Sequence, residues 1–203
     1  MKGIRGTVIA GLVGATALAA SPAVNAQAVA EKGGYVGGAF GQSKMNGACD
    51  DFRSGFGAFG GTLSSCDETD TGFKLYGGIR VNKNFNVEFS YINWGEVSST
   101  GTLAGTPVTA TGEATSFGVA AMGILPLNER FSLFGKAGIL MTDLKVTIAG
   151  GGISSSGTDD TTELHIGVGG LFNVTDRWQV RAEWERGQDS KLDLLSIGVQ
   201  YRF

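Results

Sequence analysis

Residues 194–203 read LLSIGVQYRF, and the order of apolar and polar side chains in this stretch points to the fold of the whole chain. One face of the segment carries only apolar side chains, Leu195, Ile197, Val199, Tyr201 and Phe203, while Ser196, Gly198, Gln200 and Arg202 lie on the other. A period of two predicts a β-strand with one apolar face. Chain ends normally fray and carry polar residues. A strand that finishes on an aromatic residue therefore predicts a C-terminus held in a sheet.

The same period of two recurs along the chain. In RWQVRAEWERG, residues 177–187, the apolar side chains from Trp178 to Trp184 alternate with polar ones from Gln179 to Glu185. Such segments begin near Gly34, Thr71, Asn84, Ala114, Phe131, Thr161, Arg177 and Leu192. Each segment has about 9 to 12 residues, close to the length that a tilted strand needs to cross a bilayer.

The connections between these segments alternate in length. NKN, PLNER and TD are short, whereas residues 44–70, 96–113 and 145–160 form long links rich in Gly, Ser, Thr and Asp. GQDSK, residues 187–191, is a brief exception. Short turns on one side and long loops on the other are typical of outer-membrane barrels. The sequence thus predicts an all-β fold, an eight-stranded antiparallel transmembrane β-barrel with short periplasmic turns and longer external loops.

A soluble barrel such as a lipocalin would show the same alternation, with its apolar face turned inward. The polar face here is Gly, Ser and Gln with few Lys or Glu, which makes a poor soluble surface. Aromatic residues near the expected strand ends also suggest interfacial girdles: Tyr35, Tyr91, Trp94, Phe131, Phe172, Trp178 and Tyr201. Both features favour the membrane.

The first residues have the pattern of a secretory signal peptide. Lys2 and Arg5 precede the apolar run TVIAGLVGATALAA, and Val24 and Ala26 fit a cleavage site. An uncleaved anchor is the alternative, but the run is shorter than the roughly 20 residues of a spanning helix. We therefore expect a signal peptide at residues 1–26, a barrel at 27–203 and export to the outer membrane. The net charge of −3 argues against nucleic-acid binding.

Only two cysteines, Cys49 and Cys66, occur in the chain, and both lie in the first long link. In an exported protein the default is a disulfide, whereas a metal site or reactive thiol pair would need His or CxxC neighbours that are missing here. Between them, DFRSGFGAF spaces Phe52, Phe56 and Phe59 for a turn of helix or a packed loop tip. These rings either contact a partner or pack against the loop.

Several stretches resemble a known family. GVQYRF resembles the C-terminal signal of bacterial outer-membrane proteins, and YGGIRVNKNFNVEFSYINWG, AEWERG and LSIGVQYRF resemble the barrel domain of the OmpA family. The resemblance implies that Tyr201 and Phe203 are read by the barrel-assembly machinery. Because the sequence ends at Phe203, we expect a barrel that lacks the peptidoglycan-binding domain of OmpA. It is therefore similar in size to barrel-only relatives of the OmpX and Ail type, and we expect a monomer.

The inward-facing parity carries ionisable residues, which are expensive inside a membrane and must be paired. They are Lys74, Arg80, Glu88, Lys136, Arg181, Glu183, Glu185 and Arg202. By resemblance, Glu88 occupies the place of an interior OmpA carboxylate, and Lys136 and Glu183 match other interior charges. Together with Arg181 they predict a barrel-interior charge network. Its role is either a fixed plug or the gate of a narrow, low-conductance pore.

The single histidine raises the possibility of an enzyme acting on lipid A. His165 and Glu163 share one face, so a base with an orienting carboxylate is conceivable. However, the alternation points His165 into the lumen, and no GxSxG nucleophile motif is present. We therefore predict a non-enzymatic protein without cofactor or metal.

Acidic clusters lie in the long links, at CDD, CDETD and GTDD. They lack the DxDxDG spacing of a calcium loop, so solvated charge explains them better than cation binding. The predicted role is structural or adhesion-like, through the external loops. The expected partners are outer-membrane lipid, lipopolysaccharide and a surface ligand or host partner.

Overall fold

The computed structural model describes residues 33–150 and 153–203, which form nine strands and one helix. The predicted signal peptide, residues 1–26, lies outside the described residues. The elements follow in the order β1 (Gly33–Met45), α1 (Ala48–Ala58), β2 (Thr62–Asp67), β3 (Thr69–Asn82), β4 (Phe85–Leu103), β5 (Thr106–Pro126), β6 (Phe131–Gly150), β7 (Ile153–Asn173), β8 (Trp178–Gly187) and β9 (Leu192–Arg202).

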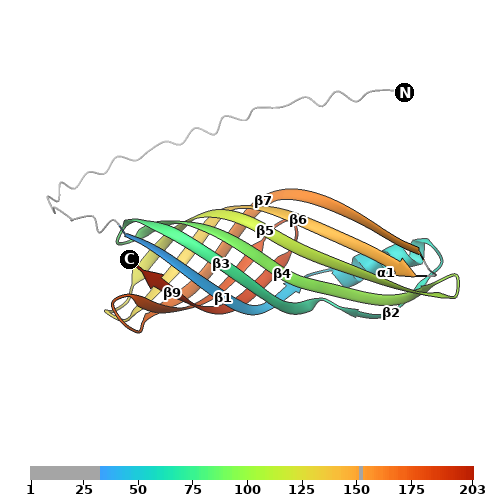
Figure 1. The fold of residues 1–203 in the computed structure, drawn as a ribbon, viewed down its shortest axis with the longest axis horizontal. Helices are drawn as coiled ribbons and strands as arrows, with labels where there is room; N and C mark the ends of the chain where they lie inside the picture. Colours follow the sequence, from blue (N-terminus) through green and yellow to red (C-terminus); the bar gives the residue numbers. More distant parts are fainter. Residues whose placement is uncertain (1–32, 151–152) are drawn as a thin grey trace, which may run out of the picture.

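Eight of the strands close into a ring, as the alternation predicts (Figure 1). Around the ring run β1, β3, β4, β5, β6, β7, β8 and β9, and every neighbouring pair is antiparallel. The ring closes where β1 pairs with β9, from Tyr35 opposite Arg202 to Met45 opposite Leu192. Closure satisfies every strand edge, which is what a bilayer demands of a spanning sheet.

The outer face of this ring is apolar. Phe40 is 65% exposed, and Leu75 and Ile197 are similarly open, whereas inward-facing Lys74 and Glu88 are buried. A water-soluble barrel would have the opposite arrangement, because apolar surface drives burial in water. The arrangement of side chains is therefore that of a transmembrane barrel, and the predicted fold class is confirmed. No helix among residues 33–150 and 153–203 is long and apolar enough to cross a membrane.

Two of the long links expected as loops are instead β-hairpins. Strands β4 to β7 contain 19, 21, 20 and 21 residues, about twice what a tilted strand needs to span a bilayer. The prediction of loops at 96–113 and 145–160 was wrong. It rested on the Gly, Ser and Thr content of these segments, which is typical of loops. The segments nevertheless keep the period of two of a β-strand.

Together these extensions form what we call the external sheet, made of β2 and residues 96–103, 106–114, 143–150 and 153–164 (Figure 1). A bulge separates it from the ring in β4, where the register with β5 shifts between Asn93 and Glu96. Gly95 has φ 78 at this point, a left-handed conformation that favours glycine. Beyond the bulge, the buried face of β4 changes from even to odd residues.

The external sheet has an open edge. Residues 153–163 of β7 pair with β6 alone, whereas the backbone oxygen of Leu164 accepts a hydrogen bond from the Gln188 N–H at 3.0 Å and the pairing with β8 begins at His165, opposite Gly187. The hydrogen-bonding groups on the other side of this stretch therefore face away from the rest of the sheet.

Two residues expected in the aromatic girdles lie inside the barrel. Tyr35 is 2% and Trp94 is 3% exposed. Both occupy the inward parity of their strands, and Trp94 donates a hydrogen bond from Nε1 to Ser116 Oγ at 2.8 Å. Other predicted members do reach the outer face, where Trp178 packs edge-on against Tyr201 with ring centroids 5.1 Å apart. The parity of an aromatic residue in its strand therefore predicts whether its side chain faces inward better than its position near a strand end does.

Candidate functional site

The interior of the ring holds a compact group of charges, which we call the charge network. It consists of Lys74 on β3, Glu88 on β4, Lys136 on β6 and Arg181, Glu183 and Glu185 on β8. The alternation of these strands turns each side chain inward, and all six are buried. The structure thus brings Glu88, Lys136, Arg181 and Glu183 together and adds Lys74 and Glu185 from the wider set. Arg80 and Arg202 are half-buried and lie towards the short-turn ends of their strands.

Glu88 is the most connected carboxylate of the network. Arg181 donates to it through both Nη1 and Nη2, at 2.5 and 3.1 Å. Tyr35 Oη donates to it at 2.9 Å, and the ammonium groups of Lys74 and Lys136 lie 3.4 and 3.5 Å away. Such a bidentate, charge-assisted arrangement is among the stronger polar contacts in proteins.

The other carboxylates complete the network from the opposite wall. Glu183 and Glu185 lie 2.9 and 3.1 Å from Lys74, and 2.5 and 2.6 Å from Lys136. The guanidinium of Arg181 also stacks between the rings of Tyr76 and Phe134, 4.5 Å from each centroid. Three cations therefore face three carboxylates, so the charge network is balanced, the arrangement that makes buried ions tolerable.

The histidine tested as a catalytic base belongs to this interior. His165 is 1% exposed, and its Nε2 lies 2.9 Å from Glu185 Oε2. Glu163 does not pair with it. Instead Glu163 accepts hydrogen bonds from Thr142 Oγ1 and from the backbone and hydroxyl of Ser190. The arrangement of a base with an orienting carboxylate on the same strand is therefore absent at this pair.

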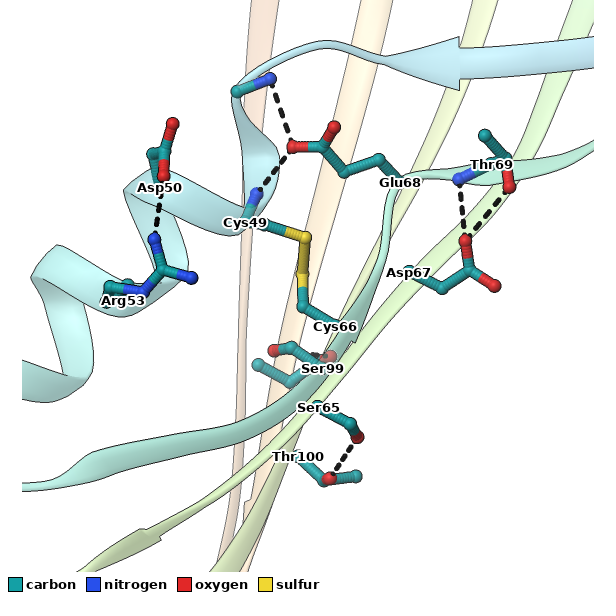
Figure 2. Close-up of a disulfide and its surroundings, with 12 residues drawn as sticks. Cys49, Asp50, Arg53, Ser65, Cys66, Asp67, Glu68, Thr69, Ser99 and Thr100 are labelled. Atoms are coloured by element: carbon teal, nitrogen blue, oxygen red, sulfur yellow. Dashed lines mark hydrogen bonds and ion pairs between the residues drawn. A yellow bond between two sulfur atoms is a disulfide. The ribbon is translucent and has the colours of Figure 1, made fainter.

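A disulfide joins Cys49 of α1 to Cys66 of β2, as the exported cysteine pair predicts (Figure 2). Glu68 holds the same helix end, because its Oε1 accepts hydrogen bonds from the backbone N–H groups of Gly47 and Cys49 at 3.2 and 3.1 Å. Gly47 precedes the helix and has no side chain with which to cap it. A distant carboxylate thus supplies the cap that the local sequence lacks.

Helix α1 packs against the external sheet through two aromatic residues, the buried Phe56 and the partly buried Phe52. Phe56 is 6% exposed and contacts Val108 and Ala110, which continue the inward face of β5. A Cβ on Gly101 would lie 2.8 Å from the Phe56 ring, so glycine makes room for it. Phe59, in contrast, is 80% exposed. Of the two interpretations of these rings, packing applies to Phe52 and Phe56, and exposure applies to Phe59.

The external end is acidic. Its carboxylates outnumber its basic side chains: Asp50, Asp51, Asp67, Glu68, Asp70, Glu96, Glu113, Asp143, Asp159, Asp160, Glu163, Asp189 and Asp193 against Lys44, Arg53, Lys145, Arg186 and Lys191. The Thr69 backbone N–H and hydroxyl both donate to Asp67 and hold the pKa of that carboxyl below its usual range. Among the described residues, no group of three or more His, Cys, Asp or Glu side chains is arranged to hold a metal ion.

The sequence did not predict a small cavity at the barrel mouth, which lies between the external sheet and the β8–β9 turn. Its shape depends on Glu163, which ties that turn to β7 through the backbone N–H groups of Asp189 and Ser190, each at 2.8 Å. The only sequence signal was a glutamate on the inward parity of β7. The contact joins residues 26 and 27 positions apart, and no local pattern encodes it.

Comparisons with known proteins agree with this geometry. Residues 10–203 match the family model described as outer membrane protein beta-barrel domain. A search of curated proteins found no match.

Among solved structures, the chain is similar to Ail, the attachment invasion locus protein of Yersinia pestis, in complex with the heparin analogue sucrose octasulfate. The identity is 19%, with 85% of this chain and 99% of that chain covered and a TM-score of 0.55. It is also similar to the N-terminal β-barrel domain of Pseudomonas aeruginosa OprF, at 13% identity, 84% and 99% coverage and TM-score 0.53. OprG from Pseudomonas aeruginosa matches at 10% identity, 86% and 97% coverage and TM-score 0.52. At these identities the structures show the fold alone. By its family model, the chain belongs to the outer membrane protein beta-barrel domain family.

Proposed function

We propose that this outer-membrane β-barrel protein is non-enzymatic and binds partners at the cell surface through its external sheet. The observation that carries the proposal is the open edge of β7 at residues 153–163, on a sheet that extends beyond the ring (Figure 1). A barrel that served only as a membrane-spanning wall would need strands of about 9–11 residues.

An open strand edge can accept an extended segment of another chain by backbone pairing. Proteins usually protect such edges with charge, because an unprotected edge also pairs with copies of itself. Asp159 and Asp160 place adjacent carboxylates on this stretch. Like charges on both strands would disfavour pairing between two copies, which supports a monomer that remains open to a different partner.

The charge network supports a structural role for the interior. Its ions are fully buried and balanced, and ring stacking holds Arg181 in place. A gated pore would need the same ions to exchange partners around a water path, and each contact broken inside the barrel is costly. We therefore propose a fixed plug. The burial of His165 beside Glu185, away from the lipid-facing surface, likewise gives no support to an enzyme acting on lipid A.

The proposal includes the route to the membrane. A signal peptide cleaved near Ala26 and assembly directed by Tyr201 and Phe203 are consistent with the family. In the outer membrane, the apolar outer face would contact lipid and lipopolysaccharide. The acidic external end does not favour polyanions such as the heparin analogue bound by Ail, so we expect a protein partner instead.

The test is to shorten the external sheet while keeping the ring. In one variant, residues 98–111 and 144–159 are each replaced by a two-residue Asn-Gly turn, which keeps Val97 opposite Gly112 and Asp143 opposite Asp160. Cells displaying this variant are compared with wild type. Binding to cultured cells and to immobilised extracellular-matrix proteins should be lost, while the heat-dependent gel shift of a folded barrel remains. Equal binding by the shortened variant, or no binding by the wild type, would contradict the proposal.

A further inference from the structure

We propose that the cavity at the barrel mouth receives a basic side chain, arginine or lysine, of a partner protein. This inference rests on the proposed surface-binding function and adds the chemistry of the partner. The cavity has a volume of about 160 Å³ and lies between β6, β7 and the β8–β9 turn. For scale, an apolar cavity of about 150 Å³ in another protein holds a benzene molecule.

The floor of the cavity is apolar. It is formed by Met45, Leu144 and Leu192, of which Met45 and Leu144 pack against a buried cluster that includes Leu192. Methylene groups of a long side chain would find contacts there that water cannot provide. A bare inorganic cation would gain nothing from such a floor, which favours a ligand with an aliphatic stem.

The rim of the cavity carries the charge. Asp159 from β7 and Asp189 from the β8–β9 turn both line it, and both are exposed. Thr161 and Ser190 add hydroxyl groups, and none of the lining residues is basic. An ammonium or guanidinium group held at this rim would pair with carboxylates while its stem rests on the apolar floor.

The rim is held in place from below. The buried carboxylate of Glu163 accepts hydrogen bonds from Thr142 Oγ1 at 3.1 Å and Ser190 Oγ at 2.6 Å, and also from the backbone N–H groups of Asp189 and Ser190. The turn that presents Asp189 is therefore fixed before any partner arrives. A preformed site avoids part of the ordering cost of binding.

The cavity also adjoins the open edge described above. Asp159 and Thr161 belong to the stretch of β7 whose far side is unpaired with β8. An extended partner segment paired there would direct every second side chain towards the inward face of the sheet. Backbone pairing and capture of one basic side chain thus use the same end of the molecule.

The experiment uses the mature protein, refolded and placed in lipid nanodiscs, with the peptide acetyl-Thr-Ser-Arg-Ser-Thr-amide as probe. Two-dimensional NMR follows the amides of residues 159–161 and 188–192 as the peptide is added. The double variant Asp159→Asn/Asp189→Asn should weaken binding about tenfold, as loss of a close charge pair does. Thr161→Phe should weaken it as much by filling the cavity without changing charge.

Two matched controls separate the site from general attraction. Asp51→Asn removes an exposed carboxylate of α1 that lies neither on the cavity nor on the open edge, and it should leave affinity unchanged. A peptide with citrulline in place of arginine keeps the shape of the probe without its charge and should bind about tenfold more weakly.

Three results would overturn the inference: no saturable binding of the arginine peptide, equal weakening by Asp51→Asn, or full binding by Thr161→Phe. These outcomes can be distinguished from failure of the proposed function. If cells with the cavity variants still adhere as wild type does, surface binding stands and only the basic side chain is excluded. If adhesion needs no external sheet at all, the proposed function itself fails.

Discussion

The ring and the external sheet are built from the same antiparallel strands, yet they solve different problems. In the ring, every strand is paired on both sides, and the six buried charges of the network pair with one another in the interior. In the external sheet, β7 keeps an open edge and carboxylates stand on the surface. The difference follows from the solvent, because lipid cannot satisfy a free strand edge or a lone charge, whereas water can. The features suited to binding, an open strand edge and surface carboxylates, therefore lie in the external sheet, outside the membrane-spanning ring.

The largest effect is expected inside the ring. Glu88→Ala would leave Arg181 buried without its bidentate partner, and it should lower the free energy of unfolding by about 3–5 kcal/mol. Urea unfolding of the refolded protein, followed by tryptophan fluorescence, measures this change. Asp160→Asn on the external sheet is the control and should shift the unfolding midpoint very little. If Glu88→Ala and Asp160→Asn lower the free energy of unfolding equally, the ring interior is no more sensitive to loss of a charge than the external sheet, and the comparison fails.

The interior could be predicted from the sequence because it depends on parity alone. The period of two places Glu88, Lys136, Arg181 and Glu183 inward without any knowledge of their partners. The same rule applied to Tyr35 and Trp94 would have placed them inside as well. They were misplaced because their position near strand ends was given more weight.

The external sheet was much harder to predict. Its strands are made of Ser, Thr and Gly, which also mark loops, and the bulge at Gly95 changes the parity in the middle of β4. The contact of Phe56 with Val108 and the hold of Glu163 on the β8–β9 turn join residues far apart in the chain. Such contacts arise only from the folded arrangement, so local patterns carry no record of them.

The next largest loss of stability is expected at the external end alone. Cys49→Ser/Cys66→Ser removes the disulfide that ties α1 to β2, worth about 3 kcal/mol for a loop of this size. We expect faster cleavage by proteases between residues 49 and 66, measured by mass spectrometry, with an unchanged heat-dependent gel shift. Loss of the gel shift would mean that the clamp also stabilises the ring.

A smaller effect is expected at the packed face of α1. Phe56→Ala should destabilise the contact of the helix with the sheet by about 2 kcal/mol, because a small cluster near the surface can partly close around the lost ring. Hydrogen exchange of the α1 amides reports this change. Phe59→Ala is the matched control, since that ring is 80% exposed and should leave exchange as in the wild type. Equal protection in both variants would rule out Phe56 as the anchor.

The smallest effect concerns the helix cap. Glu68→Ala removes the acceptor for the N–H groups of Gly47 and Cys49, at a cost of about 1 kcal/mol. Exchange at the Cys49 amide should quicken, while amides in β1 and β9 stay protected. Glu113→Ala, an exposed glutamate on β5, is the control. Uniform quickening across the molecule would show that Glu68 acts on more than α1.

The central claim is that the charge network is a fixed plug and that binding belongs to the external sheet. Its first half can be tested in a planar lipid bilayer. We expect the refolded mature protein, verified by its heat-dependent gel shift, to insert without producing discrete conductance steps, because the buried and balanced network fills the lumen. Discrete steps that change with Glu88→Ala would contradict this expectation. They would show that the interior charges gate a pore rather than plug it.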